Sequence, residues 1–201
     1  MAQSIEEFIA RGDFQLGALD AKTRIAPVTQ NGKPVFITLC ATPDLQTPWS
    51  VWPSYDGGPR CSVELLVTPQ LQKLGDHIDK VILETVKANP SQWFSKTPKS
   101  VEDLHNSVIR QPSKEQYQPT FRCKCSLRDK SASFKAWDLE RKTTLGVDEL
   151  KQLDWPNSRM AISAQLSGVY FQASGFGAVI QLKSVGFRTA SAECPFEFVE
   201  V

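Results

Sequence analysis

The stretch Phe121-Arg-Cys-Lys-Cys-Ser-Leu-Arg128 alternates apolar and polar residues along its whole length. Such alternation is typical of a β-strand with one buried and one solvated face, because successive side chains point to opposite sides of a sheet. The predicted buried face carries Phe121, Cys123, Cys125 and Leu127, and the opposite face carries Arg122, Lys124, Ser126 and Arg128. The stretch therefore predicts a strand whose solvated face is cationic.

Further segments of strand-like composition lie on both sides of this stretch. They cover residues 14–19, 33–40, 61–67, 133–139, 160–166 and 176–182. Short turn signals separate several of them, namely Gln30-Asn31-Gly32, Asp129-Lys130-Ser131 and Ala173-Ser174-Gly175. Because tight turns join antiparallel neighbours, these segments predict an antiparallel sheet.

One long helix is predicted between the early and the late strands. Thr68-Pro69 provides an N-cap followed by a proline at the first helical position, and Asn89-Pro90 provides a stop. Apolar residues recur between them with the helical period, which predicts a helix over 69–88. Shorter helical pieces are expected at 91–96 and 100–108. Together the elements predict a mainly β protein, a Greek-key barrel of five or six antiparallel strands with one long inserted α-helix.

Length and composition restrict the class of protein. The 201 residues suffice for one domain, expected over 1–188, with a short acidic tail over 189–201. A net charge of +1 excludes a histone-like polycation and a polyacidic mimic, although 108–142 holds nine basic and four acidic residues. We expect no secretory signal and no membrane partner, and hence a cytoplasmic or nuclear protein. The five cysteines are expected to be reduced thiols.

The sequence offers no arrangement typical of catalysis. Neither of the two histidines, His77 and His105, lies beside a recognisable nucleophile motif. Asp76 and Asp79 are interpreted as part of a solvated helix face. The Cys123-Lys124-Cys125 spacing is too short for a zinc knuckle. We therefore expect a protein that is not an enzyme and that needs no cofactor and no metal.

Cations and aromatic rings share the predicted sheet. Arg122, Lys124 and Arg128 lie on one strand face, and Lys135 and Trp137 lie on one face of the next strand. Cations for phosphates and flat rings for bases are what single-stranded nucleic acid binding requires. An ordinary solvated sheet face accounts for the same residues equally well.

A second aromatic group lies in the segment 41–59, which is rich in proline and glycine and is predicted to be a loop. It consists of Trp49, Trp52 and Tyr55. These rings can stack on bases from a stiff loop, or they can close one end of the barrel. Because tryptophan is highly buried on average, we expect at least one of the two tryptophans to be buried and to close the end of the barrel.

Several short motifs carry a family resemblance by their order and spacing. They are Leu45-Gln-Thr-Pro-Trp49, Arg60-Cys-Ser-Val-Glu-Leu-Leu-Val67, Ser91-Gln-Trp-Phe94, Tyr117-Gln-Pro-Thr-Phe-Arg-Cys-Lys124, Gly168-Val-Tyr-Phe171 and Phe176-Gly-Ala-Val-Ile-Gln-Leu-Lys-Ser-Val185. The chain thereby resembles the single-stranded DNA-binding proteins of the podophage replisome and their counterparts in large eukaryotic DNA viruses. The resemblance implies an OB-fold barrel that binds single strands without catalysis or cofactor, and it adds Arg60 to the candidate binding residues.

The resemblance also concerns the C-terminus. Many proteins of that family end in an acidic tail with a terminal aromatic residue. Here the tail carries Glu193, Glu197 and Glu200 together with Phe196 and Phe198, and it ends in valine. The resemblance implies that such a tail contacts a replicative polymerase or helicase. Packing of the two phenylalanine rings on the flank of the barrel accounts for the same residues equally well.

Two classes of function remain open. The first is a non-catalytic protein that coats and protects single-stranded DNA in replication, recombination or repair, in the cytoplasm or nucleus of an infected host cell. RNA and a second copy of the chain are further candidate partners. The second is an interaction protein whose barrel docks on another protein through the 49–55 loop.

Overall fold

The computed structural model describes residues 2–51, 60–128 and 131–189. Its strands are β1 (Gln3–Ser4), β2 (Gln15–Leu16), β3 (Ile25–Gln30), β4 (Lys33–Leu45), β5 (Arg60–Leu66), β6 (His105–Asn106), β7 (Ile109–Arg110), β8 (Thr120–Ser126), β9 (Lys135–Asp138), β10 (Thr143–Thr144), β11 (Ser158–Gln172) and β12 (Gly175–Thr189). Its helices are α1 (Ile5–Ala10), α2 (Pro69–Ala88), α3 (Pro90–Trp93) and α4 (Val147–Gln152), with a 3-10 turn η1 (Glu102–Leu104).

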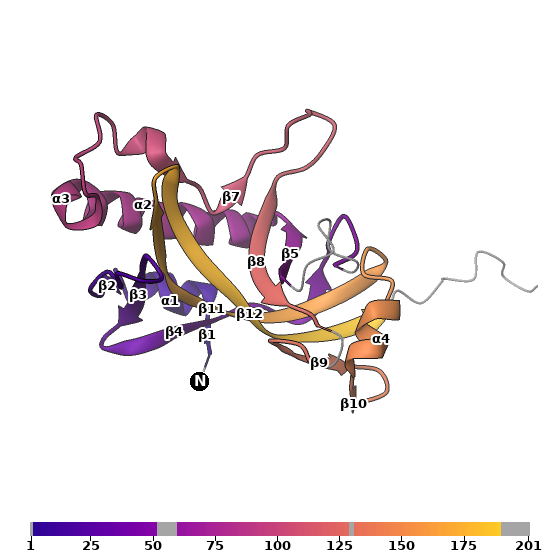
Figure 1. The fold of residues 1–201 in the computed structure, drawn as a ribbon. Helices are drawn as coiled ribbons and strands as arrows, with labels where there is room; N and C mark the ends of the chain where they lie inside the picture. Colours follow the sequence, from indigo (N-terminus) through magenta and orange to yellow (C-terminus); the bar gives the residue numbers. More distant parts are fainter. Residues whose placement is uncertain (1, 52–59, 129–130, 190–201) are drawn as a thin grey trace, which may run out of the picture.

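The strands form one extended sheet (Figure 1). Hydrogen-bonded neighbours follow the order β1-β4-β3-β11-β12-β8-β5. Off this path, β2 pairs with β3, β6 and β9 pair with β12, β7 pairs with β8, and β10 pairs with β9. The predicted mainly β class with one long helix is confirmed. The sheet is mixed, however, since β12 pairs in parallel with β6, β8 and β9. No pairing within the described residues joins the end strands β1 and β5, so the sheet stays open there.

The long β11–β12 hairpin is the centre of the sheet. β11 pairs with β12 along nearly its whole length, and its other edge pairs with β3 and β4. The predicted turn at 173–175 joins the two strands, and the predicted alternation buries Met160, Ile162, Ala164 and Leu166. Two register shifts interrupt this ladder, one between Ser163 and Ala164 and one between Leu166 and Gly168. Each shift moves the later side chains of a strand to the opposite face.

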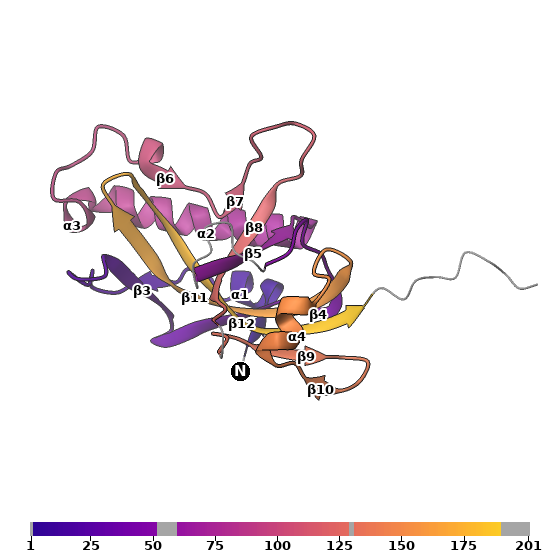
Figure 2. The same cartoon turned by 45° about the vertical axis from the view of Figure 1, so that its right-hand side comes forward.

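Helix α2 begins and ends at the predicted residues. The Thr68 hydroxyl accepts a hydrogen bond from the Leu71 N–H at 3.3 Å, and Pro69 occupies the first helical position. Its apolar stripe is buried, and Figures 1 and 2 show the helix running across the β11–β12 hairpin and β8. Gly75 permits close contact with β7, because a Cβ atom there would lie 2.8 Å from Ile109 Cγ1. No helix in the described ranges has both the length and the hydropathy required to cross a bilayer.

Several local expectations need correction. The segment 14–19 forms only the two-residue strand β2, and the strand that pairs with β4 through the Asn31–Gly32 turn is β3, which the sequence pattern did not indicate. β4 continues through Pro43 to Leu45, inside the expected loop. The capping box of Ser4 and Glu7 starts a helix, α1, that was not predicted. The pieces at 91–96 and 100–108 shorten to α3 and η1.

The predicted hairpin between 121–128 and 133–139 is only partly present. The chain does reverse there, since Leu127 and Ala132 form an isolated bridge and the Ser133 N–H donates to the Ser126 carbonyl at 2.9 Å. β9 then pairs with β12 and β10, and not with β8. The two cationic strands therefore follow one another along the same edge of β12. They are not neighbours in the sheet, because the long β12 strand offers enough free edge for both.

Candidate nucleic-acid interface

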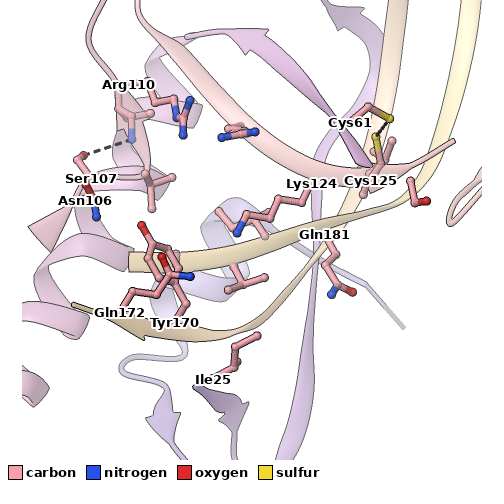
Figure 3. A pocket seen from close by; sticks show the side chains of 18 of the residues that line it. Ile25, Cys61, Asn106, Ser107, Arg110, Lys124, Cys125, Tyr170, Gln172 and Gln181 are labelled. Atoms are coloured by element: carbon pink, nitrogen blue, oxygen red, sulfur yellow. Dashed lines mark hydrogen bonds between the residues drawn. The ribbon is translucent and has the colours of Figure 1, made fainter. Parts of the chain in front are cut away.

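A groove of about 1380 Å³ lies on the solvated side of the sheet (Figure 3). Residues of β8 and β12 line it, together with the end of β11, the β6–β7 segment and the beginning of β3. In Figure 3 the side chain of Lys124 extends toward that of Tyr170, and Gln181 lies on a third strand that lines the groove. The groove thus unites residues that are far apart in the chain.

The charged side chains that line the groove are all basic. They are Arg110, Arg122, Lys124 and Lys183, with His105 beside them. Among the described residues, no aspartate or glutamate lines it. Asn106, Gln172 and Gln181 add amide groups that can both donate and accept hydrogen bonds. Such a surface attracts an extended polyanion, although the net charge of the chain is only +1.

Glu64 of β5 forms ion pairs with two of these cations. This buried carboxylate lies 3.4 Å from Arg122 Nε and 3.7 Å from Arg110 Nη1, and it accepts a hydrogen bond from the Thr120 hydroxyl at 2.7 Å. Burial lowers the pKa of Arg122, repulsion from Arg110 lowers it further, and Glu64 opposes both effects. Because arginine pKa values start so high, the guanidinium keeps its charge. Glu64 therefore fixes the position of Arg122 without cancelling the positive potential of the groove.

Tyr170 provides an aromatic surface in the groove. Its ring carries the Lys124 ammonium 5.1 Å from the ring centroid, a cation–π contact that joins β11 to β8. Nearby, the Lys183 ammonium donates to the Gln181 side-chain carbonyl at 3.1 Å. The groove thus holds cations and an aromatic ring together, the two kinds of group that bind the phosphates and the bases of a single strand.

The register shift at Gly168 explains why Tyr170 faces the groove. In unbroken alternation Tyr170 would lie on the same face as the buried Leu166, yet after the shift Val169 and Phe171 are the buried residues. Gly168 is required at this point, because a Cβ atom there would lie 2.5 Å from Ile25 Cγ2 and 2.7 Å from the Ala26 carbonyl oxygen. Glycine within a strand pattern is a known signal of such a bulge, and this signal could have identified Tyr170.

Asp79 of α2 anchors the β6–β7 segment, which forms one wall of the groove. Its carboxylate accepts hydrogen bonds from the Ser107 hydroxyl at 2.5 Å and from the Val108 N–H at 3.1 Å, and it lies 3.3 Å from His105 Nε2. The interpretation of Asp79 as part of a solvated helix face is therefore wrong. Ser107 donates to the carboxylate and not to the imidazole, so this cluster is an anchor and not a nucleophile–base pair.

The predicted binding residues occupy different places. Arg122 and Lys124 line the groove, whereas Arg128 and Lys135 are exposed outside its lining and Trp137 is half-buried there. Arg110, Lys183 and Tyr170 line the groove but were not predicted to bind. β8 pairs with β12 only at Gln181–Lys124. Further along the same edge, β12 pairs with β9, the strand that carries Lys135 and Trp137.

The predicted loop and tail residues are described only in part. The side chain of Trp49 is 49% exposed, so this tryptophan is not the one expected to close the barrel. Arg60 begins β5 opposite Ser126. Trp52, Tyr55 and the tail residues Glu193, Phe196, Glu197, Phe198 and Glu200 lie outside the described residues. In the described part of the chain, no cluster of three or more His, Cys, Asp or Glu side chains could hold a metal ion.

Comparisons with known proteins find similarity in structure and none in sequence families. No known family and no curated protein matches the sequence. The chain is similar in structure to the single-stranded DNA-binding protein from bacteriophage Enc34 in complex with ssDNA, with a TM-score of 0.43 and 16% identity over 87% of this chain and 96% of that one. It is also similar to a C-terminal truncation of the Enc34 protein, with a TM-score of 0.43 and 13% identity over 92% and 98% of the two chains.

Proposed function

We propose that this protein binds single-stranded DNA in the groove between β8, the β11–β12 hairpin and the β6–β7 segment. The observation that carries the proposal is the composition of the groove, in which four Arg and Lys side chains line the same space as the Tyr170 ring and no acidic residue is among the described lining residues. The cations contact successive phosphates. The ring stacks on a base.

Single strands fit this arrangement better than duplex DNA. Stacking requires a base whose face is free, and the bases of a duplex already cover one another. The amides of Gln172 and Gln181 line the groove beside the ring and can meet the edges of an unpaired base. We therefore propose a binder with weak sequence preference, as suits coating and protecting single strands in replication, recombination or repair. RNA has the same charge and stacking surfaces and is a further candidate ligand.

The proposed footprint extends beyond the groove. β9 continues along the edge of β12, so Lys135 and Trp137 lie in line with Lys124 along that edge. Arg128 follows β8 at the turn between them. We propose that a longer strand reaches these residues, with Arg60 and the aromatic 49–55 loop as further contacts. The exposed Trp49 also favours a second candidate function for this loop, docking on another protein.

The proposal is tested by the salt dependence of oligo-dT binding. Each lost phosphate contact lowers the slope of log K against log salt by about 0.7 for a single strand, which corresponds to about fivefold in affinity per decade of salt. We expect Lys124→Ala to lower both slope and affinity in this way. Lys135→Ala removes the same charge outside the groove and serves as the matched control, measured with an oligonucleotide just long enough to saturate the wild-type groove.

Two results would contradict the proposal that single-stranded DNA binds in the groove. Binding that is absent, or independent of salt, in the wild-type protein would exclude a phosphate-binding function. A larger loss in Lys135→Ala than in Lys124→Ala would move the primary contact to β9. Circular dichroism on both variants establishes that the fold is retained, which is expected because the Lys124 side chain is exposed.

A further inference from the structure

Two thiols meet where β5 and β8 border the groove. Cys61 and Cys125 are direct partners in the antiparallel ladder, and their Sγ atoms lie 3.2 Å apart (Figure 3). Both residues line the groove at the end near Ser126 and Ser133. The nucleic-acid contacts described above do not use these sulfur atoms.

The two thiols differ in exposure and acidity. Cys61 is half-buried and reached from the groove, whereas Cys125 is buried. A hydrogen bond between the sulfurs lowers the pKa of Cys61, assisted by the Leu127 N–H and opposed by burial. The same hydrogen bond raises the pKa of Cys125, together with burial and the nearby Cys61 and Cys123 sulfurs. Cys61 is the more exposed thiol and the one whose pKa is lowered, which makes it the candidate for the first nucleophile of the pair.

The backbone already satisfies the geometry of a disulfide. Directly opposed residues of an antiparallel pair have Cα atoms about 4.5–5.5 Å apart, within the range of about 4.4–6.8 Å that disulfides occupy. Closing the bond therefore requires small side-chain rotations and no movement of β5 against β8. The remaining described thiols lack such a partner: Cys123 faces the core with a pKa raised by burial, and Cys40 contacts the Thr42 hydroxyl at 3.6 Å.

We propose that Cys61 and Cys125 form a redox-modification site that is oxidised to an intramolecular disulfide by a low-molecular-weight disulfide such as glutathione disulfide. The Cys61 thiolate attacks one sulfur of the reagent, the reagent S–S bond breaks, and one thiolate leaves. Cys125 then loses its proton to solvent and attacks Cys61 Sγ, which expels the second thiolate. The protein dithiol loses two electrons, and the glutathione disulfide is reduced to two glutathione molecules.

The wild-type protein alone decides the proposal. Folded protein is treated with glutathione disulfide, its free thiols are alkylated, and a digest is mapped by mass spectrometry. We expect one cross-linked peptide pair joining Cys61 to Cys125, no glutathione retained on either of these two residues, and full reversal by dithiothreitol. A stable glutathione adduct on Cys61, or a cross-link that uses another cysteine, would overturn the proposal. So would a wild-type protein that keeps both thiols free under these conditions.

Two substitutions separate the roles of the thiols. In Cys125→Ser the second attack is impossible, so we expect one glutathione to remain on Cys61. In Cys61→Ser the buried Cys125 should neither cross-link nor take up glutathione in the folded protein. Cys40→Ser is the matched control and should cross-link like the wild type. Reaction of Cys61→Ser at the wild-type rate would show that Cys125 is the first nucleophile and would contradict the proposed order of attack.

Discussion

In the proposed function, Tyr170 is the residue that we expect to stack on a base in the groove. The ring is half-buried in the groove wall and lies under the Lys124 ammonium, so its orientation is set before a ligand arrives. Base–aromatic stacking contributes about 1–3 kcal/mol per base. We expect Tyr170→Ala to weaken oligo-dT binding about 5- to 150-fold, and Tyr170→Phe to retain most of the affinity because the ring remains. Fluorescence anisotropy with a labelled oligonucleotide measures both.

A matched tyrosine tests the specificity of this effect. Tyr117 is 53% exposed in the segment between β7 and β8 and does not line the groove. Tyr117→Ala should therefore bind like the wild type. If Tyr170→Ala binds normally, or if Tyr117→Ala loses as much, stacking on Tyr170 is not part of recognition.

The β6–β7 segment pairs with β12 and β8, and one side chain of α2 anchors it further. Asp79 of α2 binds the Ser107 hydroxyl, the Val108 N–H and His105 in a partly buried site. Hydrogen bonds to a charged group contribute about 1.5–3 kcal/mol each. We expect Asp79→Ala to lower the free energy of unfolding by about 2–3 kcal/mol and also to weaken oligo-dT binding, because the segment forms a wall of the groove. Urea unfolding with a constant m-value measures the first effect.

Asp76 provides the control on the same helix. It is exposed and accepts a hydrogen bond only from Gln72, at 2.8 Å, among the contacts described. Asp76→Ala should change the free energy of unfolding by no more than about 0.5 kcal/mol. Equal effects of the two substitutions would show that Asp79 does not anchor the segment.

The charge of the whole molecule supports a prediction about its C-terminal residues. Residues 190–201 carry three glutamates and no lysine or arginine, so the rest of the chain has a net charge of +4. We propose that these carboxylates compete with phosphate for the cations of the groove. Because exposed charges are screened within about 10 Å at moderate salt, the competition contributes only about 1 kcal/mol. Deleting 190–201 should tighten oligo-dT binding about fivefold at low salt, with the gain disappearing at high salt.

A charge-only variant separates this competition from other roles of the segment. Glu193→Gln, Glu197→Gln and Glu200→Gln together keep the length and the phenylalanines but remove the negative charge. The triple variant should match the deletion in affinity at every salt concentration. Unchanged low-salt affinity in both proteins would exclude competition by these carboxylates.

Local patterns in the sequence determined much of the fold. The Thr68 cap, Pro69 and the Asn89–Pro90 stop lie within a few residues of the backbone groups that they affect, so they defined α2 to its observed ends. The alternation in 121–128 likewise placed Arg122 and Lys124 on the solvated face and Phe121 and Cys123 in the core. Both signals act through neighbouring residues and need no knowledge of the rest of the chain.

Tertiary structure alone decided which residues share the groove. Strand pairing is a contact between distant residues, and no turn signal indicates that β6, β8 and β9 all pair in parallel with β12. This pairing brought Lys183 to Lys124 and placed Lys135 further along the same edge, and the pairing of β7 with β8 brought Arg110 to the groove. Tyr170 turned outward because one extra residue beside Gly168 shifts the register of β11 against β12. Alternation and capping are properties of neighbouring residues, whereas the groove depends on edges and registers that are set only when the whole sheet packs.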